Sequence, residues 1–478
     1  MSDVIVIGSG FGGAIAAKRF TEAGHRVALL ELGEDWSVPG KAQQSQDPRF
    51  IGRLLRDYPT DRLRTHPTIS ATLGMGLGGG SLVYSGIHLR APEHAFAGWP
   101  AGWTRAALDP YYARVEQRLQ IAAMTDAFAF PRPAAFRDGA AKAGLPPPVP
   151  TPLAMRGCTR CGWCIPICTF DKKLTMQHTY LADAAATGRL SVRVHRKAAY
   201  IARAGARYRV WSWRTDHVDR EYHRVASGPL EALEADIVVL AAGALESAPL
   251  LERSLHYDPP RGTERLRELP REQLGTGLDG TGDFVQGGIV PARVEAWRGA
   301  VMMSYIDLGD FVLEDIFGLP AGAAVTLDVR TQPKAWGHAY QDELRKWGAH
   351  LLGIAIVGAQ APGTARSFSV RDDAGNAVLG GRAYGPAPGA LEAARSVITA
   401  LGGELATTPW ERAKTSITVH PTGGCAMGQV VRATDLQVEN NPNLYVIDGS
   451  VLPGNPLRNP SHTIAAIAER ALDVILRA

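Results

Sequence analysis

The sequence predicts an α/β fold with two interleaved parts, one built on a parallel β-sheet and one on a large antiparallel β-sheet. A β-branched run at 4–7 leads into a glycine-rich turn, a helix-forming stretch and a second apolar run at 27–30, which is the pattern of a strand, turn, helix and strand. A further buried strand and turn occupy 236–243. Between residues 300 and 360, apolar and polar residues alternate as in antiparallel strands with one buried face.

The turn at residues 8–13 predicts a dinucleotide-binding unit of the Rossmann type. Gly8 permits the tight turn, Gly10 lets the backbone approach a pyrophosphate, and Gly13 lets helix and strand pack closely, while the helix N-terminus offers free N–H groups to phosphates. Glu31 ends the second strand, where a carboxylate accepts hydrogen bonds from a ribose. A purely structural turn is the alternative. The predicted cofactor contacts in this unit are Gly8, Gly10, Phe11, Gly12, Gly13 and Glu31.

Composition and charge exclude several classes of protein. The chain has 478 residues, a net charge of +4 and 21 % charged residues, which is ordinary for a globular enzyme. The densest basic run, at 53–64, alternates with leucine, aspartate and threonine, so it predicts a solvated face and no nucleic-acid partner. The first strand begins at Val4 and leaves no room for a signal peptide. The most apolar stretch, 237–251, is too short to cross a bilayer, so we expect a cytoplasmic protein without a membrane span.

The remaining elements follow from periodicity and from breaks in it. Residues 126–156 are rich in proline, alanine and phenylalanine without a sustained period, which predicts a long irregular loop. Helices are expected over 108–119, 180–184, 389–401 and 460–476. Strands are expected over 190–195, 208–213, 220–226, 301–307, 311–317, 324–330, 350–360 and 415–419.

Four of the five cysteines form a C-x2-C-x2-C-x3-C run, the spacing of iron–sulfur ligands in bacterial ferredoxins. A loop wrapped around a compact cluster would bring the four thiols together. The spacing therefore predicts an iron–sulfur cluster, 4Fe–4S in type, held by Cys158, Cys161, Cys164 and Cys168. A zinc site and a vestigial motif stay open as alternatives, although structural zinc sites usually separate two C-x2-C pairs by a longer span.

Three later stretches, together with the N-terminal unit, resemble the glucose-methanol-choline (GMC) oxidoreductases, and most closely their cholesterol-oxidase-like bacterial branch. These stretches are the glycine-dense run at 74–83, His-Pro-Thr-Gly-Gly-Cys-Ala-Met-Gly at 420–428, and 443–464 with Asn-Pro-Ser-His at its end. The resemblance implies bound FAD and oxidation of an alcohol. It implies further cofactor contacts at Gly76, Gly79, Gly80, Ser81, Ala198, Gly243, Asp448 and Gly449.

The resemblance also implies a division of the chain. Residues 1–90, 182–290 and 430–478 would form a Rossmann-like FAD-binding domain. Residues 91–181 and 291–429 would form a substrate domain on the antiparallel sheet, with the cysteine loop at 157–169.

Two residues match the family's catalytic pair. Oxidation of an alcohol needs a base with a near-neutral pKa and a hydrogen-bonding partner for the oxygen, and His420 and Asn459 stand where the family carries them. A capping histidine and a helix N-cap are the alternatives for these two. The family also suggests a carboxylate near 314–315, but a solvated acid is the simpler interpretation of Glu314 or Asp315. His462 is interpreted as structural and Cys425 as lying outside the cluster.

We therefore expect FAD-dependent oxidation of a sugar, polyol, sterol or other alcohol, with electrons relayed through the cluster to an external acceptor. An alcohol oxidase that uses oxygen and carries a vestigial cysteine motif is one alternative. An electron-transfer or redox-sensing protein without an alcohol substrate is the alternative of another class.

Overall fold

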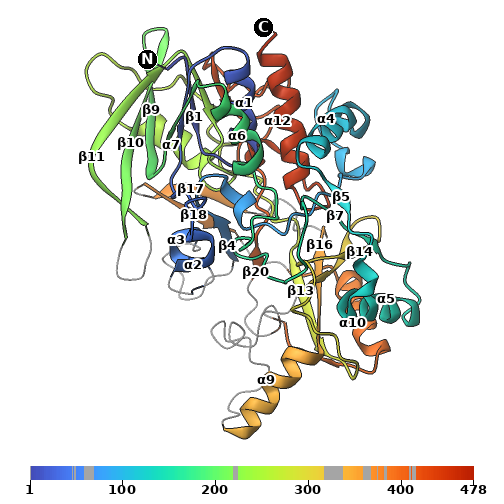
Figure 1. Ribbon diagram of the computed structural model, residues 1–478. Coiled ribbons are helices and arrows are strands. Elements are labelled where there is room, and N and C mark those ends of the chain that lie inside the picture. Colours follow the sequence, from blue (N-terminus) through green and yellow to red (C-terminus); the bar gives the residue numbers. More distant parts are fainter. Residues whose placement is uncertain are drawn as a thin grey trace.

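The computed structural model describes residues 2–45, 47, 50–58, 69–218, 224–316, 337–358, 368–373, 375–381, 385–408, 411 and 416–477. Within this part of the chain, Figure 1 shows two principal sheets one above the other, a parallel sheet beside both termini and an antiparallel sheet below it. In the same part, no helix is both long and apolar enough to cross a membrane.

The parallel sheet has the order β21-β12-β1-β2-β8 among the described residues, and every neighbouring pair is parallel. Its strands are β1 (Val4–Ile7), β2 (Val27–Leu30), β8 (Leu190–Arg193), β12 (Ile237–Leu240) and β21 (Leu444–Val446). This sheet confirms the Rossmann-like part of the predicted fold. In an open parallel sheet of this kind, ligands bind at the carboxyl ends of the strands.

Both faces of the parallel sheet are covered. Val4 and Val6 of β1 pack on helices α1 (Phe11–Glu22) and α12 (Ser461–Ile475), which lie side by side in Figure 1. Ile5 and Ile7 face the opposite core, because successive side chains of a strand alternate between its faces. That core includes α7 (Ser247–His256) and an antiparallel sheet of β9 (Arg196–Ala204), β10 (Arg207–Val218) and β11 (Arg224–Ala235).

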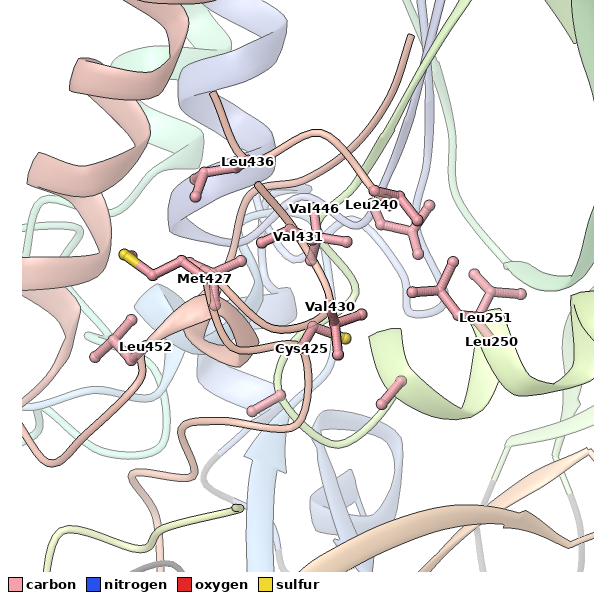
Figure 2. Packing of buried hydrophobic residues seen from close by; sticks show 14 of the residues in the cluster. Leu240, Leu250, Leu251, Cys425, Met427, Val430, Val431, Leu436, Val446 and Leu452 are labelled. Atoms are coloured by element: carbon pink, nitrogen blue, oxygen red, sulfur yellow. The ribbon is translucent and has the colours of Figure 1, made fainter. Parts of the chain in front are cut away.

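The segment that carries the 420–428 motif is anchored in the same core. Figure 2 shows Cys425 and Met427 among side chains of β12, β21 and α7. The backbone N–H of Cys425 donates to the carbonyl oxygen of Ser450 at 2.9 Å, and that of Gly423 donates to Gly449 at 3.0 Å. Cys425 is thus a buried core residue and lies apart from the four-cysteine run, as expected.

The antiparallel sheet has the order β19-β13-β16-β15-β14-β6 within the described residues. Its strands are β6 (Val149–Pro150), β13 (Phe284–Ile289), β14 (Ser304–Asp307), β15 (Val312–Ile316), β16 (Leu351–Val357) and β19 (Glu404–Leu405). This sheet confirms the second part of the predicted fold. The domain boundaries stay a prediction, and β13, which lies in the segment 182–290, belongs to this sheet.

The prediction of an irregular loop over 126–156 is wrong. Helix α5 (Pro131–Lys142) lies there and packs with α10 (Pro388–Ala400) against the antiparallel sheet. Proline is compatible with the first turn of a helix, so Pro131 and Pro133 begin α5 instead of a loop. A Cβ at Gly139 would lie 2.6 Å from the carbonyl oxygen of Val397, so this glycine allows close packing of the two helices.

The remaining elements complete the described chain. The helices are α2 (Lys41–Gln44), α3 (Ile51–Leu54), η2 (Gly79–Leu82), η3 (Glu93–Phe96), α4 (Arg105–Arg118), η4 (Ala127–Ala129), η5 (Gln177–Leu181), α6 (Ala182–Ala186), α9 (His338–His350) and η6 (Gly449–Val451). The strands are β3 (Leu55–Tyr58), β4 (Ile69–Gly74), β5 (Ala122–Ala123), β7 (Pro152–Leu153), β17 (Ser369–Asp373), β18 (Asn376–Gly380) and β20 (Ser416–Thr418). The strand predicted over 324–330 lies outside the described residues, as does Phe317.

Candidate active site

A cavity of about 620 Å³ lies between the two principal sheets. One wall of the cavity is formed by the carboxyl ends of β1, β2, β12 and β21, and the opposite wall by β13, β15 and β16. A volume of this size suits a small-molecule or cofactor site. The cavity therefore joins the predicted nucleotide-binding unit to the antiparallel sheet.

Two glycine-rich segments meet at one end of this cavity. A Cβ built on Gly12 would lie 1.6 Å from the carbonyl oxygen of Ile447, and one on Gly79 would lie 2.6 Å from the Cα atom of Gly10. By contrast, a Cβ on Gly10 or Gly80 would meet nothing within 4 Å. The backbone there faces open space at the N-terminus of α1, whose N-cap has no side-chain partner. This arrangement fits a pyrophosphate, because free N–H groups and the helix dipole favour an anion.

Most of the predicted cofactor contacts and both predicted catalytic residues line the cavity, whereas Gly13, Gly76 and Ser81 do not. The lining residues are Gly8, Gly10, Phe11, Gly12, Glu31, Gly79, Gly80, Ala198, Gly243, His420, Asp448, Gly449 and Asn459. Gly13 packs against Gly8, where a Cβ would lie 2.0 Å from the carbonyl oxygen. Gly76 donates its N–H to Glu31, and Ser81 bridges Gly78 and Met176. Their roles as cofactor contacts stay predictions.

Glu31 ties the two glycine-rich segments together. Its Oε1 accepts from the backbone N–H groups of Gly33 (2.9 Å) and Gly76 (3.3 Å), and its Oε2 accepts from the N–H (3.2 Å) and hydroxyl of Ser9. Burial raises the pKa of this carboxyl, although these hydrogen bonds oppose the change. Glu31 thus has a structural role in addition to the ribose contact predicted for it.

Asp448 connects the end of the chain to the turn after β12. Its Oδ2 accepts from the N–H of Gly243 (2.9 Å) and the hydroxyl of Ser247 (2.6 Å), while Oδ1 accepts from the N–H (2.8 Å) and hydroxyl (2.6 Å) of Ser450. These bonds hold the carboxyl ends of β12 and β21 side by side at the cavity.

The two predicted catalytic residues come together at the other end of the cavity. His420 follows β20, and its Nδ1 lies 2.8 Å from Oδ1 of Asp283. Asn459 lies two residues before the first residue of α12, whose N-cap is Pro460, and no side chain caps this helix, so the N-cap alternative for Asn459 does not hold. Within the described part of the chain, Oδ1 of Asn459 is buried without a hydrogen-bond partner. A buried acceptor of this kind suits a ligand that brings its own donor.

The electrostatic surroundings of His420 favour its protonated form. Burial lowers the pKa of the imidazole, but the carboxylates of Asp283 and Glu314 raise it more, so the pKa lies above its ordinary value. The ring keeps 22 % of its side-chain surface accessible. That surface faces the cavity, which the residue lines.

The interpretation of Glu314 and Asp315 as solvated acids is wrong, because both are fully buried. They lie on opposite faces of β15, as consecutive strand residues must. Glu314 lines the cavity, and neither of its carboxyl oxygens has a hydrogen-bond partner of normal geometry among the described residues. Burial raises its pKa to about 7, opposed by the charge of His420 and the nearby amide of Asn459. A carboxyl with such a pKa exchanges protons near neutrality.

Asp315 belongs to a buried ion pair on the other face of the antiparallel sheet. Its Oδ2 lies 2.8 Å from Nε of Arg132, and its Oδ1 accepts from the backbone N–H groups of Met303 (2.8 Å) and Ser304 (2.6 Å). Arg132 also donates to the carbonyl oxygens of Ala296 and Ala300. This pair supports the wall of the cavity from behind.

Sequence reasoning did not single out Asp283 as a functional candidate, and it named Glu314 only to prefer the interpretation of a solvated acid. The acid pair inside the apolar run 312–316 is itself a signal. In a strand with one buried face, one of two consecutive acids must point into the core, where acids are rare. Asp283 left no comparable signal, because its partner His420 is far away in the chain. His462, interpreted as structural, is buried behind the cavity against His88 and Tyr112, and burial lowers its pKa to about 4.

The four-cysteine loop closes one side of the cavity through Ile165 and Pro166. A buried lysine organises this loop: Nζ of Lys173 donates to the carbonyl oxygens of Cys164 (2.8 Å) and Tyr84 (2.7 Å). Burial lowers the pKa of Lys173 to about 8 and raises that of the Cys164 thiol to about 11.

The geometry of the loop does not support the predicted iron–sulfur cluster. Cys164 and Cys168 are buried, whereas Cys158 and Cys161 are partly exposed, and none of the four forms a disulfide. Among the described residues, no group of three or more cysteine, histidine, aspartate or glutamate side chains is placed to hold a metal ion. The loop is arranged by backbone contacts, such as those of Lys173, that the spacing of the cysteines does not reveal.

Comparisons with known proteins agree with this geometry. Residues 2–256 match the N-terminal part of the GMC oxidoreductases and residues 389–468 the C-terminal part. The chain is 27 % identical over 539 residues to a cholesterol oxidase of Mycobacterium tuberculosis, covering 98 % of this chain and 90 % of the relative. It is 25 % identical over 556 residues to a 2-methyl-1,2-propanediol dehydrogenase of Mycolicibacterium austroafricanum, covering 100 % of this chain and 95 % of the relative.

A solved structure supports the fold. The crystal structure of pyridoxine 4-oxidase from Mesorbium loti superposes with a TM-score of 0.70 at 21 % identity, covering 99 % of both chains. The glycine-lined end of the cavity fits the dinucleotide that this fold implies, and the family's cofactor is FAD. The chain belongs to the GMC oxidoreductase family and is an FAD-dependent oxidoreductase that acts on CH–OH groups.

Proposed function

We propose that this enzyme oxidises a hydroxyl group on a largely apolar small molecule and that molecular oxygen reoxidises its flavin. The observation that carries the proposal is the composition of one cavity wall. His420, Glu314 and Asn459 line the cavity together with apolar side chains of the antiparallel sheet and its neighbours, namely Val285, Met302, Ile316, Ala355 and Val357. An apolar pocket with a few converging polar groups binds an apolar body and orients one polar group.

The glycine-lined end of the cavity would hold the cofactor. The backbone of Gly8, Gly10 and Gly12, with the N-terminus of α1, would bind the pyrophosphate, and Gly80 and Gly449 would lie along the remainder. When bound, FAD supplies an acceptor for the hydride that leaves the carbinol carbon.

The polar groups at the other end would handle the proton. Nδ1 of His420 is engaged by Asp283, so Nε2 is the ring nitrogen left to accept the proton of the substrate hydroxyl. Asn459, whose Oδ1 is buried without a partner in the described structure, would hydrogen-bond the carbinol. Glu314 would contact the substrate beside it, since its carboxyl oxygens are likewise without partners there.

The proposed acceptor rests on the relatives. One similar protein is named a cholesterol oxidase, and a protein with this fold is named pyridoxine 4-oxidase. The spacing of the four cysteines supports the relay alternative, in which electrons pass through an iron–sulfur cluster to an external carrier. The name of the propanediol dehydrogenase is compatible with that alternative.

Anaerobic mixing tests the reaction class. The purified flavoprotein is mixed with apolar primary and secondary alcohols and with sugars and polyols matched for size, and the oxidised flavin band is followed. We expect bleaching by apolar alcohols with at least tenfold better kcat/KM than by polyols. If no alcohol bleaches the flavin, an electron-transfer or redox-sensing protein becomes the better interpretation.

A second measurement tests the acceptor. With a bleaching alcohol, oxygen consumption and peroxide release are compared with the reduction of a one-electron dye. Under the proposal, peroxide forms in a one-to-one ratio with the carbonyl product. Dye reduction without peroxide release would show that an external carrier, and not oxygen, accepts the electrons.

A further inference from the structure

Asp283 is the only described side chain that forms a hydrogen bond with the imidazole of His420. The contact is short, 2.8 Å between Oδ1 and Nδ1, and both residues line the cavity. We infer that Asp283 is a positioning residue, which holds His420 in the tautomer with Nδ1 protonated and so keeps Nε2 as the proton acceptor. This inference rests on the proposed role of His420.

The surroundings of Asp283 require it to be an acceptor. Its Oδ2 accepts from the backbone N–H of Val419 (3.1 Å), and the hydroxyl of Thr418 lies 2.9 Å from the same oxygen. The hydroxyl of Thr281 donates to Oδ1 at 2.8 Å. Since the N–H of Val419 and the hydroxyl of Thr281 each donate to one of its oxygens, Asp283 acts as an acceptor, and Nδ1 of His420 supplies the proton of their shared bond.

The backbone fixes the two residues in register. The N–H of Asp279 donates to the carbonyl of Thr422 and the N–H of Thr422 donates to the carbonyl of Asp279, each at 2.8 Å. The loop before β13 and the segment after β20 are therefore paired beside the Asp283–His420 contact. At Thr281 and Gly282 the backbone has φ angles of 53° and 66°, and a non-glycine residue in this region is strained. This turn places Asp283 within hydrogen-bond distance of Nδ1 of His420.

A second acid faces His420, and it has a different relation to the ring. Glu314 on β15 interacts with the imidazole through its charge but forms no hydrogen bond with it in the described structure. Loss of either acid charge would lower the pKa of His420. Loss of Asp283, but not loss of Glu314, would also leave the imidazole free to adopt either tautomer. The effect on the pKa and the effect on the tautomer can therefore be separated.

The experiment uses the FAD-loaded enzyme with ¹⁵N-labelled histidine, and the His420 resonances are assigned from their loss in His420→Gln. Three variants are compared with the wild type: Asp283→Asn, Glu314→Gln and Asp279→Asn. Asp279→Asn is the control, because it removes a charge from the same loop. The amide oxygen of the substituted side chain can still accept from the N–H of Thr281, as the carboxylate of Asp279 does at 3.0 Å. FAD absorbance of each variant reports an intact fold.

At a pH above the pKa of His420, we expect the wild type to hold a neutral imidazole with Nδ1 protonated. Asp283→Asn should mix the tautomers and lower the pKa, Glu314→Gln should lower the pKa with the tautomer unchanged, and Asp279→Asn should change neither. A base acts when neutral, so kcat/KM rises with pH through its pKa. Asp283→Asn should therefore move the acidic limb of kcat/KM to lower pH and reduce its plateau on the order of 10²-fold.

Two results would overturn the inference: an unchanged tautomer in Asp283→Asn, or a rate lowered equally at every pH with no movement of the acidic limb. The tautomer is read without turnover. If the wild type oxidises no alcohol, the proposed function fails while the resonance measurement still decides the role of Asp283.

Discussion

Glu314 and Asp315 are neighbours in the chain with opposite surroundings, and the alternation of a β-strand is the reason. Asp315 points away from the cavity and is neutralised by Arg132, whereas Glu314 faces the cavity and its oxygens have no hydrogen bond of normal geometry among the described residues. A buried carboxyl without a partner is costly unless a proton or a ligand satisfies it. At the scale of the residue, the site is therefore defined by which polar groups the protein leaves unsatisfied.

The first prediction at this scale concerns the base. His420→Ala should retain FAD but lose about 10²–10⁴ of turnover, the usual contribution of a positioned proton acceptor. Stopped-flow bleaching of the flavin measures the loss without interference from reoxidation. His462→Ala is the comparison variant, because His462 lies outside the cavity lining. Equal rates for wild type and His420→Ala would move the role of base to another residue.

At the scale of the element, the N-terminal helix depends on one close approach. A Cβ on Gly12 would lie 1.6 Å from the backbone oxygen of Ile447, which no side-chain rotation can relieve. Helix α1 would have to move away from the loop after β21, and both line the proposed pyrophosphate site. The glycine is thus required by packing between two elements distant in the sequence.

Gly12→Ala should consequently be purified with little or no FAD. The ratio of flavin to protein absorbance measures this directly. Gly389→Ala is a matched control, since Gly389 lies in the first turn of α10 and a Cβ there would meet nothing within 4 Å. Gly389→Ala should keep full FAD content. Normal flavin content in Gly12→Ala would show that α1 adjusts without loss of the site.

The ion pair between α5 and β15 gives a second prediction at this scale. Arg132→Met should lower the free energy of unfolding by about 3–5 kcal/mol, because it leaves the carboxylate of Asp315 buried without its counter-charge. Chemical denaturation at neutral pH measures the change. Arg137→Met, in the same helix but in an exposed pair with Asp138, should change stability by less than about 1 kcal/mol. Similar values for both variants would contradict a special role for the buried pair.

At the scale of the whole molecule, the active cavity exists only where the two principal sheets face each other. The parallel sheet contributes the glycine backbone that would bind the cofactor. The antiparallel sheet contributes neighbours of His420 and the apolar wall. The cysteine loop joins this assembly from outside both sheets and contributes Ile165 and Pro166 to the cavity. Its place beside the cavity holds whether or not its thiols bind metal.

The last prediction tests that loop in the intact enzyme. If oxygen reoxidises the flavin directly, protein that was purified anaerobically should contain far less than one iron or zinc per chain. Cys161→Ser should keep its FAD and its rate of peroxide release, because Cys161 does not line the cavity. The alternative would be supported if the wild type contained iron and acid-labile sulfide near stoichiometry and Cys161→Ser lost both of them together with dye reduction. Electrons would then pass through an iron–sulfur cluster to an external carrier.

Local patterns in the sequence were sufficient to predict the parallel sheet, the glycine turn at its edge, the antiparallel sheet and the family. These features depend on residues a few positions apart: Gly8, Gly10 and Gly13 specify one turn, and alternation specifies a strand, so the information lies within each segment. The predicted roles of His420 and Asn459, the domain boundaries and the cytoplasmic location stay predictions.

Only the tertiary structure decided the features that depend on distant partners. Helix α5 forms where the prolines of 126–156 suggested a loop, because its apolar face packs on α10 and the antiparallel sheet. Glu314 is buried in the cavity and not solvated, because strand pairing around β15 encloses it. Asp283 reaches His420 because two remote loops pair in register. Such contacts arise from packing between segments, and the free energy of packing is not encoded in any one of them.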